Sequence, residues 1–113
     1  MKIVAVTACP TGIAHTYMAA EALELAARGR GHWVKAETQG TLGIENEITL
    51  KEAQSVDAVV YAADIQIRKR ERFAGKLTLE VGVAEAIRHA DAVIRQVEDK
   101  LAQPASPCSP RQS

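Results

Sequence analysis

The residues best suited to chemistry lie in one segment near the amino terminus. It begins with a thiol, Cys9, and continues as Pro-Thr-Gly-Ile-Ala-His-Thr over residues 10–16. A short run rich in β-branched residues precedes the segment, and a stretch rich in helix-forming residues follows it. The thiol is therefore expected at a strand-to-helix junction, where several backbone N–H groups of the first helical turn have no partner within the helix.

Such a junction is suited to a phosphoryl group. Gly12 lets the backbone curl so that successive N–H groups converge on a tetrahedral anion at the helix N-terminus. A free thiol has a pKa near 8.5, and a helix N-terminus or a nearby cation lowers that pKa to about 7 or below. The same N–H groups would stabilise the equatorial oxygens of a phosphoryl group during transfer. The predicted phosphate-binding residues are Pro10, Thr11, Gly12, Ile13, Ala14, His15 and Thr16.

Other interpretations of Cys9 have to be weighed. A cysteine at a strand end is more often a small buried hydrophobic residue, so the functional interpretation depends on the glycine and hydroxyls that follow. The loop also has the outline of a tyrosine-phosphatase signature, in which five residues separate the Cys from an Arg. His15 occupies the Arg position, so the loop lacks a bidentate guanidinium, and no aspartate is evident as a leaving-group acid. Phosphate carriage is favoured, with a small cysteine-dependent phosphatase as the alternative.

Redox or metal chemistry is a weaker hypothesis. The chain has no Cys-x-x-Cys, and Cys9 with His15 supplies two of the four ligands that a zinc site needs. No metal and no cofactor is therefore predicted. His15 itself either steadies the phosphoryl group or caps local backbone. The second cysteine, Cys108, lies among prolines and serines and is expected to be a mobile free thiol without a role. Two cysteines so far apart do not form a disulfide framework, which favours the cytoplasm.

The segments that must position the loop alternate between strands and helices. Strands are expected at residues 2–8, 33–38, 58–63 and 77–81, and helices at 14–28, from Thr49 onward, and at 83–101. This alternation implies right-handed βαβ units in an α/β three-layer sandwich, Rossmann-like, with a four-stranded parallel sheet flanked by helices. Thr49 and Glu52 have the spacing of a capping box. Two helical stripes are expected to face the core: Ala14, Met18, Ala22 and Leu25, and then Val83, Ile87, Ala90, Ile94, Val97 and Leu101.

Ligands of such sheets bind beyond the carboxyl ends of the strands. Glu37 and Asp64 lie at strand ends there, and either orient the loop or are simply solvated or capping residues. His32 and His89 are expected at the surface. The basic run Arg68, Lys69, Arg70 and Arg72 is either a solvated helix face or a docking patch for an acidic partner.

Composition argues against nucleic-acid-binding and membrane-inserted proteins. The chain has 113 residues, enough for one domain, and 14 basic residues balance 14 acidic ones. A zero net charge argues against general binding to nucleic acid or to anionic membranes. No apolar run approaches the roughly 20 residues that a membrane-spanning helix needs, so no direct membrane insertion is expected. Residues 103–113 are rich in Pro, Ser and Gln and are expected to be a disordered tail or linker.

Several motifs together resemble one family. Residues 4–16 read VAVTACPTGIAHT and residues 18–23 read MAAEAL, which resembles the opening of the fructose-family IIB component of the bacterial sugar phosphotransferase system. ETQG at 37–40, GIENE at 43–47, ADI at 63–65 and RFAGK at 72–76 follow in that family's order. The resemblance covers about residues 2–101 and implies a four-stranded parallel sheet, with residues 1–102 as the IIB domain.

The resemblance also implies a role and partners. Cys9 would accept phosphate from a phosphohistidine of the IIA component and pass it to a sugar, usually fructose, bound by the membrane component IIC. The activity would be that of a protein-Nπ-phosphohistidine–D-fructose phosphotransferase. The domain would be cytoplasmic and would associate with the inner face of the membrane through IIC.

Overall fold

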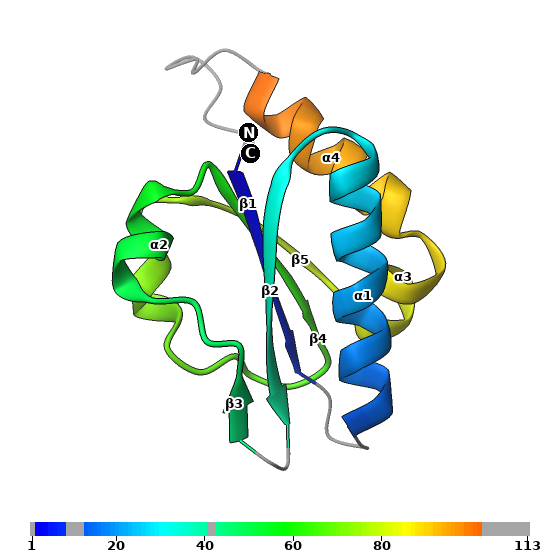
Figure 1. Ribbon diagram of the computed structural model, residues 1–113, viewed down its shortest axis with the longest axis vertical. Coiled ribbons are helices and arrows are strands. Elements are labelled where there is room, and N and C mark those ends of the chain that lie inside the picture. The colour runs from blue at the N-terminus through cyan, green and yellow to red at the C-terminus, as the bar shows by residue number, and fades with distance from the viewer. Residues whose placement is uncertain (1, 9–12, 41–42, 103–113) are drawn as a thin grey trace.

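The computed structural model describes residues 2–8, 13–40 and 43–102 (Figure 1). Its elements are β1 (Lys2–Ala8), α1 (Ile13–Gly29), β2 (Trp33–Gly40), β3 (Gly43–Glu45), α2 (Leu50–Ser55), β4 (Ala58–Ala63), the 3-10 helix η1 (Arg70–Phe73), β5 (Leu77–Val81), α3 (Val83–Arg88) and α4 (Ala90–Ala102). The order confirms the predicted alternation of strands and helices.

The sheet has the strand order β3-β2-β1-β4-β5. β1 lies in the middle and pairs in parallel with β2 and β4, and β4 pairs in parallel with β5. The four predicted parallel strands are therefore present. A fifth strand, β3, was not predicted, and it pairs antiparallel with the end of β2. It has three residues, too few for the alternation that identifies a strand in a sequence.

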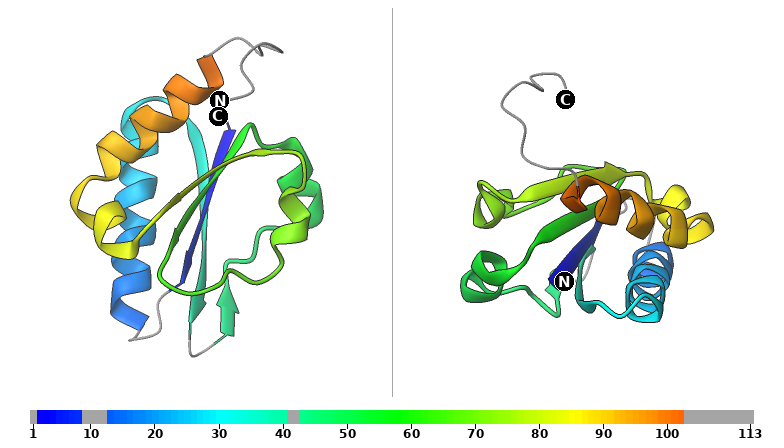
Figure 2. Two further views of the ribbon diagram at one scale, coloured as in Figure 1. Left: turned by 180° about the vertical axis from the view of Figure 1, so that it is seen from behind. Right: turned by 90° about the horizontal axis from the view of Figure 1, so that it is seen from above.

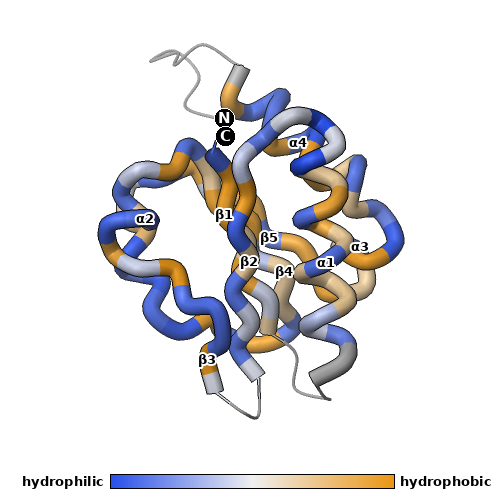
Figure 3. The backbone as a smooth tube through the Cα atoms, in the orientation of Figure 1, coloured by the Kyte–Doolittle hydropathy of each residue, from blue (hydrophilic) through white to orange (hydrophobic). Residues whose placement is uncertain are grey.

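Helices cover both faces of this sheet. Figures 1 and 2 show α1, α3 and α4 on one face and α2 with η1 on the other. Because successive side chains of a strand point to opposite faces, β1 contributes Ile3 and Ala5 to one core and Val4 and Val6 to the other. Figure 3 shows the resulting concentration of hydrophobic residues along the central strands. Residues 3–8 of β1 are all buried, so the end of this strand is a rigid support for whatever follows it.

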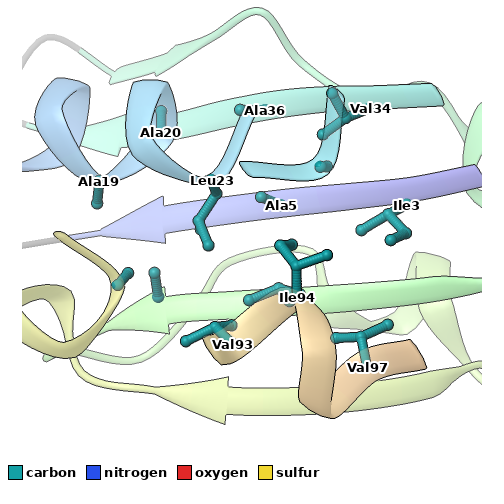
Figure 4. Close-up of a cluster of buried hydrophobic side chains, with 14 of the residues drawn as sticks. Ile3, Ala5, Ala19, Ala20, Leu23, Val34, Ala36, Val93, Ile94 and Val97 are labelled. Carbon is teal, nitrogen blue, oxygen red and sulfur yellow. The ribbon is translucent and has the colours of Figure 1, made fainter. Parts of the chain in front are cut away.

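α1 packs on the sheet through a different face from the predicted one. Met18 and Leu25 are 49% and 62% exposed. The helix is buried instead through Ala19, Ala20, Leu23 and Ala27. Figure 4 shows the first three beside β1 and β2. The prediction was wrong because α1 carries apolar residues around most of its circumference, so that two stripes have helical spacing. The small alanines form the buried stripe and let the helix lie close to the sheet.

The predicted last helix is two helices. α3 and α4 are separated at His89, whose backbone leaves the helical region with φ −131° and ψ 40°. The chain has neither Gly nor Pro at this position, so no local signal marked the break. Val83, Ile94 and Val97 of the predicted stripe are buried, and Ile87, Ala90 and Leu101 pack partly buried against the same core.

The capping box of α2 is confirmed. The Thr49 hydroxyl accepts a hydrogen bond from the Glu52 backbone N–H at 3.1 Å, and the Glu52 carboxylate accepts one from the Thr49 N–H at 2.9 Å.

Within the described residues, none of the helices combines the length and the hydrophobicity needed to cross a membrane.

Candidate functional site

The strand-to-helix junction predicted around Cys9 has its two described ends where the sequence placed them. β1 ends at Ala8, in the middle of the sheet, and α1 begins at Ile13. Ala14, His15 and Thr16 belong to the first turns of α1. Cys9, Pro10, Thr11 and Gly12 lie outside the described residues, so the position of the thiol and the converging N–H groups stay predictions.

Thr7 fixes α1 to β1 just before the junction. Its side chain is fully buried, and its hydroxyl donates a hydrogen bond to the Thr16 carbonyl oxygen at 3.1 Å. Thr16 is itself 1% exposed, so this hydrogen bond lies in the interior. His15 is exposed on the same turn. The entry and exit of the predicted loop are therefore held at a fixed separation by a bond between two buried residues.

Glu37 is a buried, ion-paired residue, neither solvated nor a helix cap. Its side chain has no exposed surface, and its carboxylate accepts four hydrogen bonds. Arg72 donates two of them, at 2.6 and 3.0 Å, and the Ile48 backbone N–H and the Gln39 amide donate the others at 2.8 and 2.7 Å. Burial alone would raise the pKa of this carboxyl group. The donors outweigh that effect, and the pKa lies below its usual value.

Arg72 belongs to this buried network rather than to a surface patch. Its side chain is 7% exposed. Besides the two bonds to Glu37, its guanidinium donates to the carbonyl oxygens of Ile48 at 2.7 Å and Lys69 at 2.8 Å. One arginine therefore joins β2 to the segment before α2 and to the turn before η1.

Gln39 belongs to the same buried network, and the sequence interpretation did not single it out. It is 4% exposed. Its side-chain oxygen accepts from the Arg68 backbone N–H at 2.8 Å, and its side-chain nitrogen lies 3.0 Å from the Arg68 carbonyl oxygen. Glu37 and Gln39 are two residues apart on a strand and therefore share a face. Two polar residues at that spacing in a buried strand are a signal that could have indicated a polar network.

Three of the four cations in the basic run have an acidic partner. Arg70 and Arg72 lie in η1, and Arg68, Lys69 and Arg70 are exposed. Lys69 pairs with Glu47 at 2.5 Å, and Arg70 pairs with Glu80 and lies over the Tyr61 ring, 4.5 Å from its centroid. Arg72 pairs with Glu37 as described above. Among the described residues, the Arg68 guanidinium has no acidic partner.

Asp64 acts as a capping residue, one of the two roles considered for it. Its carboxylate accepts a hydrogen bond from the backbone N–H of Val83, the first residue of α3, at 3.3 Å. Its own N–H donates to the Ala8 carbonyl oxygen at 3.1 Å. Asp64 thus connects the end of β4 to the last residue of β1 and to α3, although its side chain is exposed.

The two other histidines differ from each other. His89 is exposed, as predicted. The prediction for His32 was wrong, because its side chain is only 10% exposed and its Nε2 lies 2.5 Å from a Glu98 carboxylate oxygen. Glu98 also accepts two hydrogen bonds from Arg30, at 2.6 and 2.7 Å. This cluster is at the amino-terminal end of β2, the opposite end from Gln39.

Comparison of the structure with solved structures first defines the class. At 14% identity and a TM-score of 0.51, the chain shares the fold of the lactose-specific IIB component domain of the phosphoenolpyruvate:carbohydrate phosphotransferase system from Streptococcus pneumoniae, covering 91% of this chain and all of that one. At this low identity the likeness shows the fold alone, that of an α/β protein. A much closer likeness is to the solution structure of an Enzyme IIB subunit of the phosphotransferase system from Escherichia coli K12. That structure has a TM-score of 0.84 at 38% identity, covering 89% of this chain and 94% of that one.

Sequence comparison then gives the family. The family described as PTS system, Lactose/Cellobiose specific IIB subunit matches residues 4–96. The fructose-like EIIB component 2 of Escherichia coli K12 is 54% identical over 104 residues, which are 92% of this chain and 98% of that protein. The chain belongs to the IIB family of the bacterial sugar phosphotransferase system. The 2-O-alpha-mannosyl-D-glycerate-specific EIIABC component of the same organism is also 54% identical, over 83% of this chain and 14% of that protein. These relatives support a phosphocarrier role in sugar uptake and do not favour the phosphatase alternative.

Proposed function

We propose that Cys9 carries the phosphoryl group, which it receives from a phosphohistidine of a IIA component and delivers to a sugar bound by a IIC component. The observation that supports this most directly is the junction at the carboxyl end of β1. The sequence places the thiol immediately after Ala8 and the helix begins at Ile13. A cysteine in that position meets the N-terminus of a helix, where a thiolate and a phosphoryl anion are both stabilised.

The chemistry needs a nucleophile and donors for the transition state. The Cys9 thiolate attacks phosphorus, a P–S bond forms, and the P–N bond to the donor imidazole breaks. In the second transfer a sugar hydroxyl oxygen attacks, the P–S bond breaks and the hydroxyl proton passes to solvent. The N–H groups of the helix start would hold the equatorial oxygens in both steps. Each step exchanges one bond to phosphorus for another, so no redox partner takes part.

His15 supports carriage over hydrolysis. It occupies the position where a tyrosine phosphatase has its arginine, and it is exposed on the first turn of α1. An imidazole cannot make the bidentate contact that a guanidinium makes with a phosphate. The S-phosphoryl group would therefore persist long enough to be passed on.

The proposed substrate is fructose, and the proposed activity is that of a protein-Nπ-phosphohistidine–D-fructose phosphotransferase. Relatives are named for fructose, and one is named for mannosylglycerate. Some of them carry A, B and C components in one chain, which supports IIA and IIC as partners. We also propose that residues 1–102 form the domain, that 103–113 are a tail or linker, and that the domain works at the cytoplasmic face of the membrane through IIC.

Phosphorylation followed by intact mass tests the central proposal. Incubation with phosphoenolpyruvate, the general phosphotransferase proteins and a matching IIA is expected to add one phosphate to the wild-type protein. Cys9→Ser is expected to take none, because a serine hydroxyl is barely ionised at neutral pH. Cys108→Ser, the matched control, is expected to be phosphorylated normally. Phosphate on a histidine, or phosphate retained in Cys9→Ser, would contradict the proposal.

A further inference from the structure

The buried polar network of Glu37, Gln39 and Arg72 lies beside the end of β1. In the sheet, Glu37 is the neighbour of Val6, and Gln39 is the neighbour of Ala8, the last residue before Cys9. Ala8 and Val6 belong to the core on the α2 side of the sheet. The network is therefore one strand away from the predicted loop and on the face opposite to α1.

Gln39 binds a segment that comes from the other side of β1. Residues 64–69 follow β4, and β1 lies between β4 and β2 in the sheet. Because Gln39 of β2 bonds both the N–H and the carbonyl oxygen of Arg68, the segment must cross the carboxyl end of β1. Ile67 is buried in the same core as Ala8, which is consistent with this path.

The crossing segment presents an exposed surface at the edge where ligands of parallel sheets bind. Ile65 is 45% exposed, and Gln66 and Arg68 are exposed as well. The partner that brings the phosphoryl group must approach Cys9 at this edge. The segment is held in place by Gln39, and α1, on the other face, is held in place by Thr7.

The energetics indicate that the network positions the backbone rather than stabilises the fold. A buried ion pair such as Glu37–Arg72 stabilises a fold little, because apolar residues of similar volume are often as good or better. What the network does supply is a defined backbone position, because Arg72 and Gln39 together bond carbonyl oxygens or N–H groups of Ile48, Arg68 and Lys69.

We propose that Gln39, supported by Glu37 and Arg72, is a positioning residue for phosphoryl transfer. It places residues 65–68 where the phosphorylated donor protein docks. Activation of the thiol depends instead on the N-terminus of α1. This inference rests on the proposed function. It predicts that donor recognition can be weakened while thiol reactivity is unchanged, whereas a general loss of structure would affect both.

Three variants test the proposal. Gln39→Met removes the two bonds to Arg68 and the bond to Glu37 with little change of volume. Thr7→Val removes the bond to Thr16 of α1 and a longer one, at 3.4 Å, to the Glu37 carbonyl oxygen. Lys35→Met is the control. Lys35 is on the same strand and face as Gln39, about 13 Å away along the strand, and it forms an ion pair with Glu52 of α2. The measurements are the initial rate of phosphoryl transfer against the concentration of phosphorylated IIA, and the rate of Cys9 alkylation against pH in a Cys108→Ala background.

Gln39→Met is expected to raise the KM for phosphorylated IIA by about tenfold, since the two lost hydrogen bonds to Arg68 are worth roughly a factor of ten or more. Its kcat and its alkylation midpoint should match the wild type. Thr7→Val should shift the alkylation midpoint upward, and Lys35→Met should change neither quantity. If Gln39→Met does not fold, Glu37→Leu/Arg72→Met removes the support without leaving a buried charge and should give the same rise in KM.

An unchanged KM in folded Gln39→Met, or an alkylation midpoint that moves as in Thr7→Val, would overturn the proposal while leaving Cys9 as the phosphocarrier. A wild-type protein that takes up no phosphate at all would overturn both this inference and the proposed function. The two failures are thus distinguishable in one set of measurements.

Discussion

Glu37 and Arg72 are 35 residues apart in the chain and form a bidentate ion pair in the interior, with N–O distances of 2.6 and 3.0 Å. Both side chains are enclosed, Glu37 completely and Arg72 to all but 7% of its surface. The pair joins β2 to the crossover between β4 and β5. A charge that looks like part of a basic surface run in the sequence is therefore neutralised inside the protein.

The ion pair predicts an asymmetry between single and double substitutions. Arg72→Met leaves the Glu37 carboxylate buried without its cation, which should lower the free energy of unfolding by about 3–5 kcal/mol. Glu37→Leu/Arg72→Met leaves no buried charge and should recover most of that loss. Urea unfolding at neutral pH measures both. A double variant as unstable as the single one would show that the destabilisation does not come from the unpaired charge.

The cluster of Arg30, His32 and Glu98 predicts a dependence of stability on acid pH. The hydrogen bonds from Arg30 and then His32 lower the pKa of Glu98 to about 2, whereas in the unfolded chain it lies near 4.5. A lowered pKa in the folded state means that the contribution to stability is complete above about pH 4.5 and is lost as the pH falls towards 2.

The test compares Glu98→Gln with the wild type by urea unfolding between pH 7 and pH 2.5. The variant should be less stable at pH 7, and the difference should shrink progressively below pH 4.5. Glu85→Gln is the control, because Glu85 is exposed on α3 and should show no comparable trend. A difference between Glu98→Gln and the wild type that stays constant down to pH 2.5 would contradict the prediction.

The parts of the fold that the sequence predicted are those with strong local signals. The buried run of β1, the alternation of elements and the capping box at Thr49 and Glu52 all depend on residues close together in the chain. The buried face of α1 could not be predicted from spacing, because Met18 and Leu25 have the same periodicity as the alanines that are buried. The break at His89 has no local marker, since neither Gly nor Pro stands there.

The candidate site likewise has one part that local sequence signals predict and another that depends on residues far apart in the chain. The junction after Ala8 was predictable because a strand signal and a helix signal flank Cys9. The pairing of Glu37 with Arg72 was not, since Arg72 meets Glu37 only because the chain crosses over β1. Gln39, two residues from Glu37 on the same strand, was missed although its spacing was visible. Charge counting likewise could not show that Lys69, Arg70 and Arg72 each have an acidic partner elsewhere in the sequence.

Arg68 is the residue of the basic run that we expect to contribute to electrostatic docking. Since the other three cations of the run are paired, Arg68→Gln alone should slow phosphoryl transfer from IIA a few-fold at low salt, and the defect should shrink as salt rises and screens the charge. Arg28→Gln is the matched control. Arg28 is exposed in the last turn of the 17-residue α1, about 22 Å from the helix start. Equal rates for the two variants at low salt would contradict a docking role for Arg68.

The two cysteines provide the most direct test of the junction itself. The helix N-terminus should favour the thiolate of Cys9, whereas nothing in the sequence around Cys108 should do so, and a thiol without such help has a pKa near 8.5. The rate of alkylation against pH, measured on Cys108→Ala and Cys9→Ala proteins, should therefore give a clearly lower midpoint for Cys9. Because the helix dipole alone is worth roughly 0.3–1 kcal/mol and one pKa unit is about 1.4 kcal/mol, a shift of more than one unit requires converging N–H groups as well. Equal midpoints near 8.5 would show that the loop does not bind an anion in the way its sequence predicts, and phosphoryl transfer would then need another means of activating the thiol.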